Sequence, residues 1–179
     1  MSEIGLGAFG NCEKLSEIYV NADNDKYCEQ GGLVIDKKQK QAVFAIPGRE
    51  KIMISNGFES FRKGCFATCR VKEIDLKSDN VVFAKKGNYI YRKDKKALAV
   101  GVVNGNTAVI PEGIEELNQN SVLIGQNISK VTMPSSLKCL RGAWLDMVPV
   151  GQKIYVPRQS IKLYKKWMKQ NGEKSKIIY

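Results

Sequence analysis

The side chains of this chain support only a narrow range of chemistry. The 179 residues include five cysteines and no histidine. Without an imidazole, Ser–His–Asp and Cys–His catalysis, His-ligated zinc sites and a histidine pH switch are all excluded. The segment 135–138 (Ser-Ser-Leu-Lys) lacks a supporting partner motif, and no glycine loop matches a phosphate-binding pattern. The sequence therefore predicts a protein that is not an enzyme, with no catalytic residues, no cofactor and no metal.

The cysteines allow two interpretations. Cys12 and Cys69 occupy equivalent positions of a repeat, so they are candidates for a disulfide between neighbouring coils of chain. Alternatively, they belong to a buried row of small apolar side chains, since free cysteine is often buried. A zinc site at Cys65 and Cys69 is not supported, because no second pair has metal-ligand spacing. The redox state of the cysteines stays open.

The chain is strongly basic. Lys and Arg together number 29 against 18 Asp and Glu, a formal net charge of +11. One hypothesis is attraction to a polyanion such as a glycan, an anionic cell envelope or nucleic acid. The other is a solvated face that keeps the protein soluble. The candidate polyanion-binding residues lie in two turns and near the C-terminus: Lys37, Lys38, Lys40, Lys93, Lys95, Lys96, Lys165, Lys166 and Lys169.

Two internal repeats organise these residues. The apolar pattern of residues 15–20 recurs at 71–76, and that of 33–35 recurs at 89–91, so both pairs share one offset of about 56 residues. In the second half, an apolar ladder that starts at Ile110 has steps of 4, 3, 5, 6, 3 and 2, and it starts again at Met133. The basic unit is therefore about 23 residues, and two units carry an inserted segment.

An apolar ladder of this period indicates a solenoid. One coil cannot bury its own apolar side, so successive coils stack and share an interior. Short alternating segments suit strands, and charged turns between apolar runs suit β-hairpins. We expect Phe9, Phe66, Val122 and Leu145 to form one buried row, and Ile18, Ile74, Val131 and Ile154 another.

The C-terminus departs from the ladder. Ile161, Tyr164 and Met168 fall on one apolar face of a helix, and Gly172 is a plausible stop. We expect this helix to cap the stack, because terminal units need a polar outer side. The predicted organisation is a solenoid over 1–157, with coils at about 1–20, 52–76, 108–133 and 134–157, hairpin inserts at about 21–51 and 77–107, and a cap over 158–179.

The ladder resembles a known family. Ile-Pro-x-Gly-Ile-x-x-Leu at 110–117, Ala-Phe-x-x-Cys-x-x-Leu-x-x-Ile at 8–18 and Cys-Phe-x-x-Cys at 65–69 are similar to the BspA-like leucine-rich repeats of bacteria. The resemblance implies a mostly β leucine-rich-repeat solenoid with hairpin inserts and a C-terminal capping helix. It also implies a non-enzymatic protein-binding or adhesion module of a bacterial surface or exported protein, whose ligand is a host matrix protein or another cell-surface protein.

Outward strand positions are where a solenoid meets its partner. The candidates run from acidic to basic along the predicted stack: Glu17, Tyr19, Glu73, Asp75, Lys130, Thr132, Lys153 and Tyr155. Tyrosine favours a protein-binding surface, although solvent-facing strand positions must in any case be polar. Polyanion binding through the lysine clusters and a purely structural role as a spacer remain as alternative functions.

The location of the protein has two competing indications. No run of the sequence approaches 18 apolar residues, which predicts no membrane span. The family resemblance implies an extracellular or cell-surface protein, yet the first twenty residues lack the pattern of a secretory signal. A cytoplasmic location therefore stays open. The first coil begins without an N-terminal cap, so we expect either a fragment of a longer chain or a covering partner.

Overall fold

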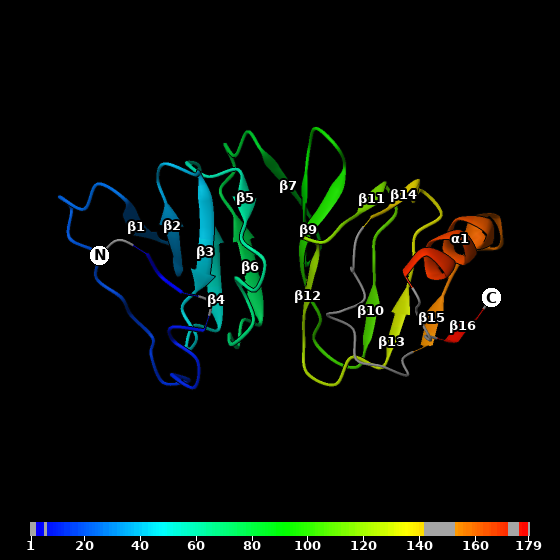
Figure 1. Ribbon diagram of the computed structural model, residues 1–179, viewed down its shortest axis with the longest axis horizontal. Helices are drawn as coiled ribbons and strands as arrows, with labels where there is room; N and C mark the ends of the chain where they lie inside the picture. Colours follow the sequence, from blue (N-terminus) through cyan, green and yellow to red (C-terminus); the bar gives the residue numbers. More distant parts are fainter. Residues whose placement is uncertain (1–2, 6, 142–152, 172–175, 179) are drawn as a thin grey trace. The chain divides into compact units, whose positions relative to one another are not determined.

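The computed structural model describes residues 3–5, 7–141, 153–171 and 176–178. The chain divides into two compact units, Met1–Val82 (unit 1) and Phe83–Tyr179 (unit 2). Strands make up most of the regular structure in each unit (Figure 1). Both units wind as a β-solenoid, which confirms the predicted fold class.

Unit 1 begins with a three-stranded antiparallel meander. Its strands are β1 (Tyr27–Gln30), β2 (Leu33–Asp36) and β3 (Gln41–Ala45), and they lie side by side in Figure 1. Strands β4 (Lys51–Ile54), β5 (Ser60–Phe61) and β6 (Glu73–Leu76) follow. β3 pairs in parallel with β5, and β4 pairs in parallel with β6. The predicted hairpin insert is thus a meander of three strands. Its last strand, β3, also pairs with the following strand β5 and so belongs to the solenoid.

Side-chain and backbone turns fix the start of this meander. The Asn24 side-chain oxygen accepts hydrogen bonds from the backbone N–H groups of Lys26 (3.0 Å) and Tyr27 (2.7 Å), an Asx turn that leads into β1. Gly31 and Gly32 connect β1 to β2 with φ of 61° and 88°. A Cβ at Gly31 would also lie 2.2 Å from the Met53 carbonyl oxygen, so this position needs glycine on both counts.

Unit 2 repeats this arrangement and continues it. Its meander is β7 (Phe83–Lys86), β8 (Tyr89–Arg92) and β9 (Ala97–Val102). The later strands are β10 (Thr107–Val109), β11 (Glu116–Leu117), β12 (Val122–Ile124), β13 (Lys130–Thr132), β14 (Cys139–Leu140), β15 (Lys153–Tyr155) and β16 (Lys176–Ile178). Parallel pairing joins them in the orders β9-β11-β14, β9-β12 and β10-β13-β15-β16.

The two meanders have the same backbone features at positions about 56 residues apart, the longer offset of the sequence. The β-bulge of unit 1 lies between Val34 and Ile35, and that of unit 2 lies at the matching place, between Ile90 and Tyr91. The turns that follow also match: Lys40 has φ of 48° and Lys96 has φ of 49°, both in the left-handed region. The two inserts are therefore copies of one structural module.

The interval of about 23 residues in the sequence ladder appears as the register between the parallel strands β13, β15 and β16. Lys130 pairs with Lys153, and Lys153 pairs with Lys176, so each coil here has the length that the ladder predicts. Ala108, Val131 and Ile154 then stand in one row and are almost completely buried. Full burial of a valine or isoleucine side chain stabilises the fold by roughly 1.5–3 kcal/mol. The alternation of buried and outward residues is the predicted ladder.

The C-terminal helix is present as predicted. α1 (Ile161–Asn171) follows the short 3-10 helix η2 (Arg158–Ser160) and lies beside β14 in unit 2 (Figure 1). Tyr164 and Trp167 are buried in the core of this unit. Lys162, Lys165 and other lysines of the helix face solvent, which gives the end of the stack a polar cover.

Part of the predicted rows is wrong in unit 1. Ile18 lies in a segment without strand structure and is only half-buried. The strand neighbour of Ile74 is not Ile18 but Ile52 of β4, at the start of the predicted coil 52–76. Phe9 is half-buried and stacks on Phe44 of the meander, with ring centroids 4.6 Å apart. Leu145 lies outside the described residues.

The two meanders differ in one packed pair. In unit 1 Leu33 of β2 lies opposite Ala45 of β3, and at the same places in unit 2 Tyr89 lies opposite Gly101. A Cβ at Gly101 would lie 2.5 Å from the Tyr89 ring, so the glycine makes room for the larger side chain. The Tyr89 hydroxyl also accepts a hydrogen bond (3.0 Å) from the backbone N–H of Val109.

We predict that Gly101→Ala destabilises the protein by about 1–3 kcal/mol, because the added methyl overpacks the Tyr89 ring. Tyr89→Leu removes that ring and with it the clash. In the double variant the cost should fall below the sum of the two single costs by about 1 kcal/mol, measured by urea unfolding. Strict additivity would contradict the proposed contact.

A second prediction concerns the core of unit 1. Phe66 is 5% exposed and its ring centroid lies 5.3 Å from that of Phe61. Phe66→Asp should lower the free energy of unfolding by more than about 3 kcal/mol, because it leaves a cavity and buries an unpaired carboxylate. Tyr19→Asp is the matched control, since Tyr19 is 89% exposed. Equal thermal melting of the two variants would disprove the buried position of Phe66.

Candidate functional site

The outward face of β10, β13 and β15 in unit 2 carries four of the predicted partner residues. Lys130 and Lys153 stand opposite one another, and Thr132 stands opposite Tyr155. Neighbouring strands lie about 4.8 Å apart, so paired side chains on one face are in close reach. The structure therefore brings these four residues together on one surface.

The paired lysines form an uncompensated row. Like charges that stand directly opposite one another in a sheet destabilise it. Among the described residues, neither Lys130 nor Lys153 has an acidic partner. Val109, which is 55% exposed, adds an apolar side chain to the same face. We name this surface, made of Val109, Lys130, Thr132, Lys153 and Tyr155, the lysine face.

In unit 1 an outward lysine has acidic partners on the neighbouring strand. Lys51 of β4 stands opposite Glu73 of β6, and its Nζ lies 3.0 Å from a Glu73 carboxylate oxygen and 2.8 Å from one of Asp75. The hydrogen bonds to Asp75 and Glu73 raise the pKa of Lys51. Glu73 and Asp75, both predicted as partner residues, are thus paired within their own sheet.

Glu17 and Tyr19 lie apart from these strands. Their segment has no strand structure, and the Tyr19 hydroxyl donates a hydrogen bond (2.8 Å) to the Glu17 carboxylate. This bond raises the pKa of Tyr19. The eight predicted partner residues therefore fall into three groups: Glu17 and Tyr19, the paired carboxylates of β6, and the four residues of β13 and β15.

The first strand of each outward face was not among the predicted partner positions. Lys51 and Met53 of β4, and Thr107 and Val109 of β10, point outward beside the predicted residues. The signal was present in the alternation of Lys-Ile-Met-Ile at 51–54 and Thr-Ala-Val-Ile at 107–110, separated by the same offset as the hairpins. The predicted partner positions included none of these residues, although each of the two segments spans the start of a predicted coil.

The lysine turns are tied to the next coil. The turn that joins β2 to β3 holds Lys37, Lys38 and Lys40, and the Lys40 ammonium lies 3.0 Å from the Glu59 carboxylate. In the matching turn of unit 2 the Lys96 ammonium lies 2.7 Å from Glu115. The turn lysines are therefore partly neutralised within the protein, which weakens their attraction for a polyanion.

Other predicted polyanion residues of unit 2 are exposed. Lys93 and Lys95 belong to the turn between β8 and β9, and Lys165, Lys166 and Lys169 lie on the solvent side of α1. Glu115 pairs with both Lys96 and Lys138, and these two ammonium groups, Lys138 first, lower the pKa of its carboxyl.

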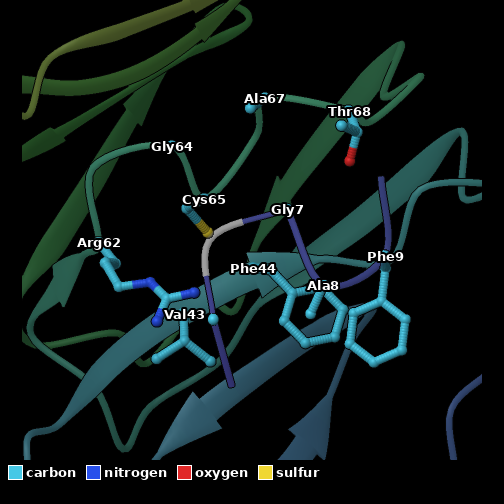
Figure 2. Close-up of a pocket in the computed structure, with 11 residues that line it drawn as sticks. Gly7, Ala8, Phe9, Val43, Phe44, Arg62, Gly64, Cys65, Ala67 and Thr68 are labelled. Atoms are coloured by element: carbon cyan, nitrogen blue, oxygen red, sulfur yellow. The ribbon is translucent and has the colours of Figure 1, made fainter. Parts of the chain in front are cut away.

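A small hollow in unit 1 surrounds the thiol of Cys65 (Figure 2). Its volume is about 30 Å³, enough for one water molecule. Arg62 lies at its rim and donates a hydrogen bond (2.8 Å) to the Ile4 carbonyl. Its Nε is buried and has no hydrogen-bond partner among the described residues. Cys65 is 2% exposed, and burial raises the pKa of its thiol well above the usual range. This hollow has neither the size nor the reactive thiolate of a catalytic site.

Both interpretations of the cysteines need correction. All five cysteines lie within the described residues and their thiols are free, so no disulfide joins Cys12 to Cys69 there. Cys12 is exposed, which also excludes it from a buried row, because its segment does not form a strand of the solenoid. Cys69 is half-buried, and burial raises the pKa of its thiol. Across the part of the chain that the structure describes, no group of three or more potential metal ligands is placed to hold an ion.

These thiols give a third prediction. With Ellman's reagent at pH 8, Cys12 should react at least about tenfold faster than Cys65, because only exposed thiols with an accessible thiolate react readily. Cys12→Ser should remove a fast phase, while Cys65→Ser should leave the fast phase intact. In urea all five thiols should react alike. A fast phase that survives Cys12→Ser and disappears in Cys65→Ser would contradict the burial of Cys65.

Parallel strands that pair one coil apart, with a buried apolar row behind an outward polar row, define a leucine-rich-repeat β-solenoid. The family model described as BspA type leucine rich repeat region (6 copies) matches residues 37–97. Residues 37–97 are therefore similar to the BspA-type leucine-rich repeat, which confirms the resemblance over that part of the chain. No curated protein and no solved structure matches it.

The match to this repeat family indicates a general role. Leucine-rich repeat domains generally mediate protein interactions and are typically not enzymes. BspA-type members are usually found at the cell surface or are secreted. In the described part of this chain, no helix is both long enough and apolar enough to cross a bilayer.

Proposed function

We propose that this protein is a non-enzymatic protein-binding module of a bacterial surface or exported protein, with a role in adhesion. The lysine face of unit 2 is its binding surface. The partner is a host matrix protein or another cell-surface protein that presents an acidic segment. The repeat family supports a protein-interaction role, and the charges of this face supply the chemistry of the partner.

This proposal depends most on the row of Lys130 and Lys153, for which the described part of the chain offers no acidic partner. In unit 1 the same protein pairs Lys51 of β4 with Glu73 and Asp75 of β6, so its sheets have a means of balancing the charge of an outward lysine. Unit 2 keeps the repulsive arrangement, which costs stability in the unbound protein. An acidic partner segment removes this cost on binding and gains complementary charge contacts.

The apolar and aromatic members of the face add contact area. Val109 is 55% exposed, and Tyr155 is half-buried opposite Thr132. Tyrosine is enriched in protein interfaces, where it combines a rigid ring with a hydroxyl group. Alternation along β10, β13 and β15 directs these side chains to the same side as the lysines, while the buried row behind them faces the core.

The fourth prediction tests the lysine face. Lys153→Glu creates a pair with Lys130, so it should stabilise the fold by about 0.2–1 kcal/mol and weaken binding of a fluorescent deca-glutamate peptide about tenfold. Lys162→Glu makes the same change of charge on the exposed side of α1 and should change the affinity by less than about twofold. Fluorescence anisotropy and urea unfolding measure the two effects.

The outcome separates a local site from bulk charge. Equal losses of affinity in the two variants would show attraction to the net charge alone and would overturn the assignment of the face. The adhesion role is tested by capture of matrix and bacterial surface proteins on the immobilised chain. A partner whose retention is lost in Lys153→Glu supports it, and no retention by wild type across the panel favours a spacer.

A further inference from the structure

A second hollow, in unit 2, has the size of a small-ligand site. Its volume is about 310 Å³, at the lower end of the range for ligand pockets. Lys86 comes from the end of β7, Tyr91 from β8, and Lys93 and Lys96 from the turn before β9. Glu112 and its neighbours complete the wall between β10 and β11. None of these residues belongs to the lysine face.

The hollow is positively charged because three lysines outnumber its one carboxylate, that of Glu112. The Glu112 carboxylate accepts hydrogen bonds from the Ser135 backbone N–H (2.6 Å), the Ser135 hydroxyl (2.9 Å) and the Ser136 backbone N–H (3.1 Å). These hydrogen bonds lower the pKa of the Glu112 carboxyl, and the bond from the Ser135 backbone N–H has the largest effect. The Glu112 carboxylate therefore holds the next coil in place.

Two of the ammonium groups at the hollow are held in place by the protein. The Lys86 ammonium donates a hydrogen bond (2.7 Å) to the backbone carbonyl of Glu112, which leaves further N–H groups of the same ammonium for a ligand. The Lys96 ammonium is held by Glu115 at 2.7 Å, an ion pair that partly neutralises its charge but leaves further N–H groups for a ligand. Anchored lysines lose less conformational freedom when they bind an anion than freely moving ones do.

The wall is partly apolar as well. Tyr91 lines the hollow and is half-buried, and it packs against the core of unit 2. Ile114 lies at the wall and is 1% exposed. An aromatic side chain offers flat apolar surface together with a hydroxyl group. A site of this kind suits a ring-shaped ligand that carries one anionic group, since a bare inorganic ion uses only its lysines.

Unit 1 has other residues at these positions. The offset between the two modules places Gln30 where unit 2 has Lys86, and Ile35 where unit 2 has Tyr91. Gln30 is occupied by the Ser55 hydroxyl (2.7 Å), and Ile35 is 2% exposed in the core. The same backbone module thus exists without the cation and without the phenol, so their presence in unit 2 is not required by the fold.

We propose that this hollow binds an anionic sugar, a pyranose ring that carries a sulfate or a carboxylate group. The ammonium groups of Lys86, Lys93 and Lys96 bind the anion, and Tyr91 packs against the ring. This site is separate from the protein-binding face, so the protein has two recognition surfaces in unit 2.

The test uses the full chain and the residues of unit 1 as replacements. Lys86→Gln and Tyr91→Ile each install what unit 1 carries, so the module should keep its fold. Binding of glucose 6-sulfate and of glucuronate is followed by ¹H–¹⁵N chemical shifts in low salt. We expect each variant to weaken the better-bound of these sugars at least about fivefold. Lys38→Gln, an exposed turn lysine of unit 1, should leave the affinity within about twofold.

Further probes decide the chemistry. Glucose should not bind, and sodium sulfate should bind at least about fivefold more weakly than the better anionic sugar. Stronger binding of glucose 6-sulfate identifies the anion as a sulfate, and stronger binding of glucuronate identifies it as a carboxylate. Equal affinity for sodium sulfate and the sugar would overturn the proposal of a ring site, and so would an unchanged affinity in Lys86→Gln.

The two proposals fail independently. Lys153→Glu should leave sugar binding unchanged, and Lys86→Gln should leave deca-glutamate binding unchanged. Displacement of the sugar by deca-glutamate would assign the hollow to a protein ligand instead and overturn the present inference. Loss of peptide binding alone in Lys153→Glu, with the sugar still bound, supports both sites.

Discussion

Pairing of each strand with the strand one coil further along the chain is the constraint on which the rest depends. In unit 2 the register from Ala108 to Val131 and from Val131 to Ile154 places three apolar side chains in one row and excludes water from them. A slip by one residue would turn the whole row outward. The same register determines which outward side chains meet, so the charge pattern of each surface follows from the packing of the core.

Two units with the same backbone therefore present different chemistry. In unit 1 an acidic residue, Glu73, follows Lys51 by one coil, and the ion pair between them balances the charge of the lysine. In unit 2 a lysine follows Lys130 by one coil, and the described structure offers neither an acidic partner. The module of unit 2 likewise replaces Gln30 and Ile35 of unit 1 by Lys86 and Tyr91. Function in such a repeat protein resides in the positions that the core leaves unconstrained.

Much of the fold was predictable, because burial repeats with the period of the backbone. The short ladder predicted the buried positions of Val131 and Ile154, and the longer offset predicted the matching hairpins. The prediction was wrong for Ile18. Its segment has the alternation of a strand but forms none, since β4 is the strand that pairs with β6.

The candidate site was only partly predictable. Outward positions of β13 and β15 follow from alternation, but Val109, at the start of the predicted coil 108–133, was not among the predicted partner positions. The hollow near Tyr91 joins residues from β7, the β8–β9 turn and the segment after β10, and no local periodicity encodes such a meeting of side chains. It depends on how the meander folds back on the next coil, and only the three-dimensional structure shows it.

Lys40 and Lys96 adopt a backbone conformation that ordinarily favours glycine or asparagine. Each of these lysines instead reaches a glutamate of the following coil, Glu59 in one unit and Glu115 in the other. The side chain at the tip of the turn thus makes a long-range contact at a local cost to the main chain. A coil added after such a turn would need a glutamate at the equivalent position to bind the turn lysine. In the design of longer arrays, this pair of lysine and glutamate identifies the boundary between one module and the next.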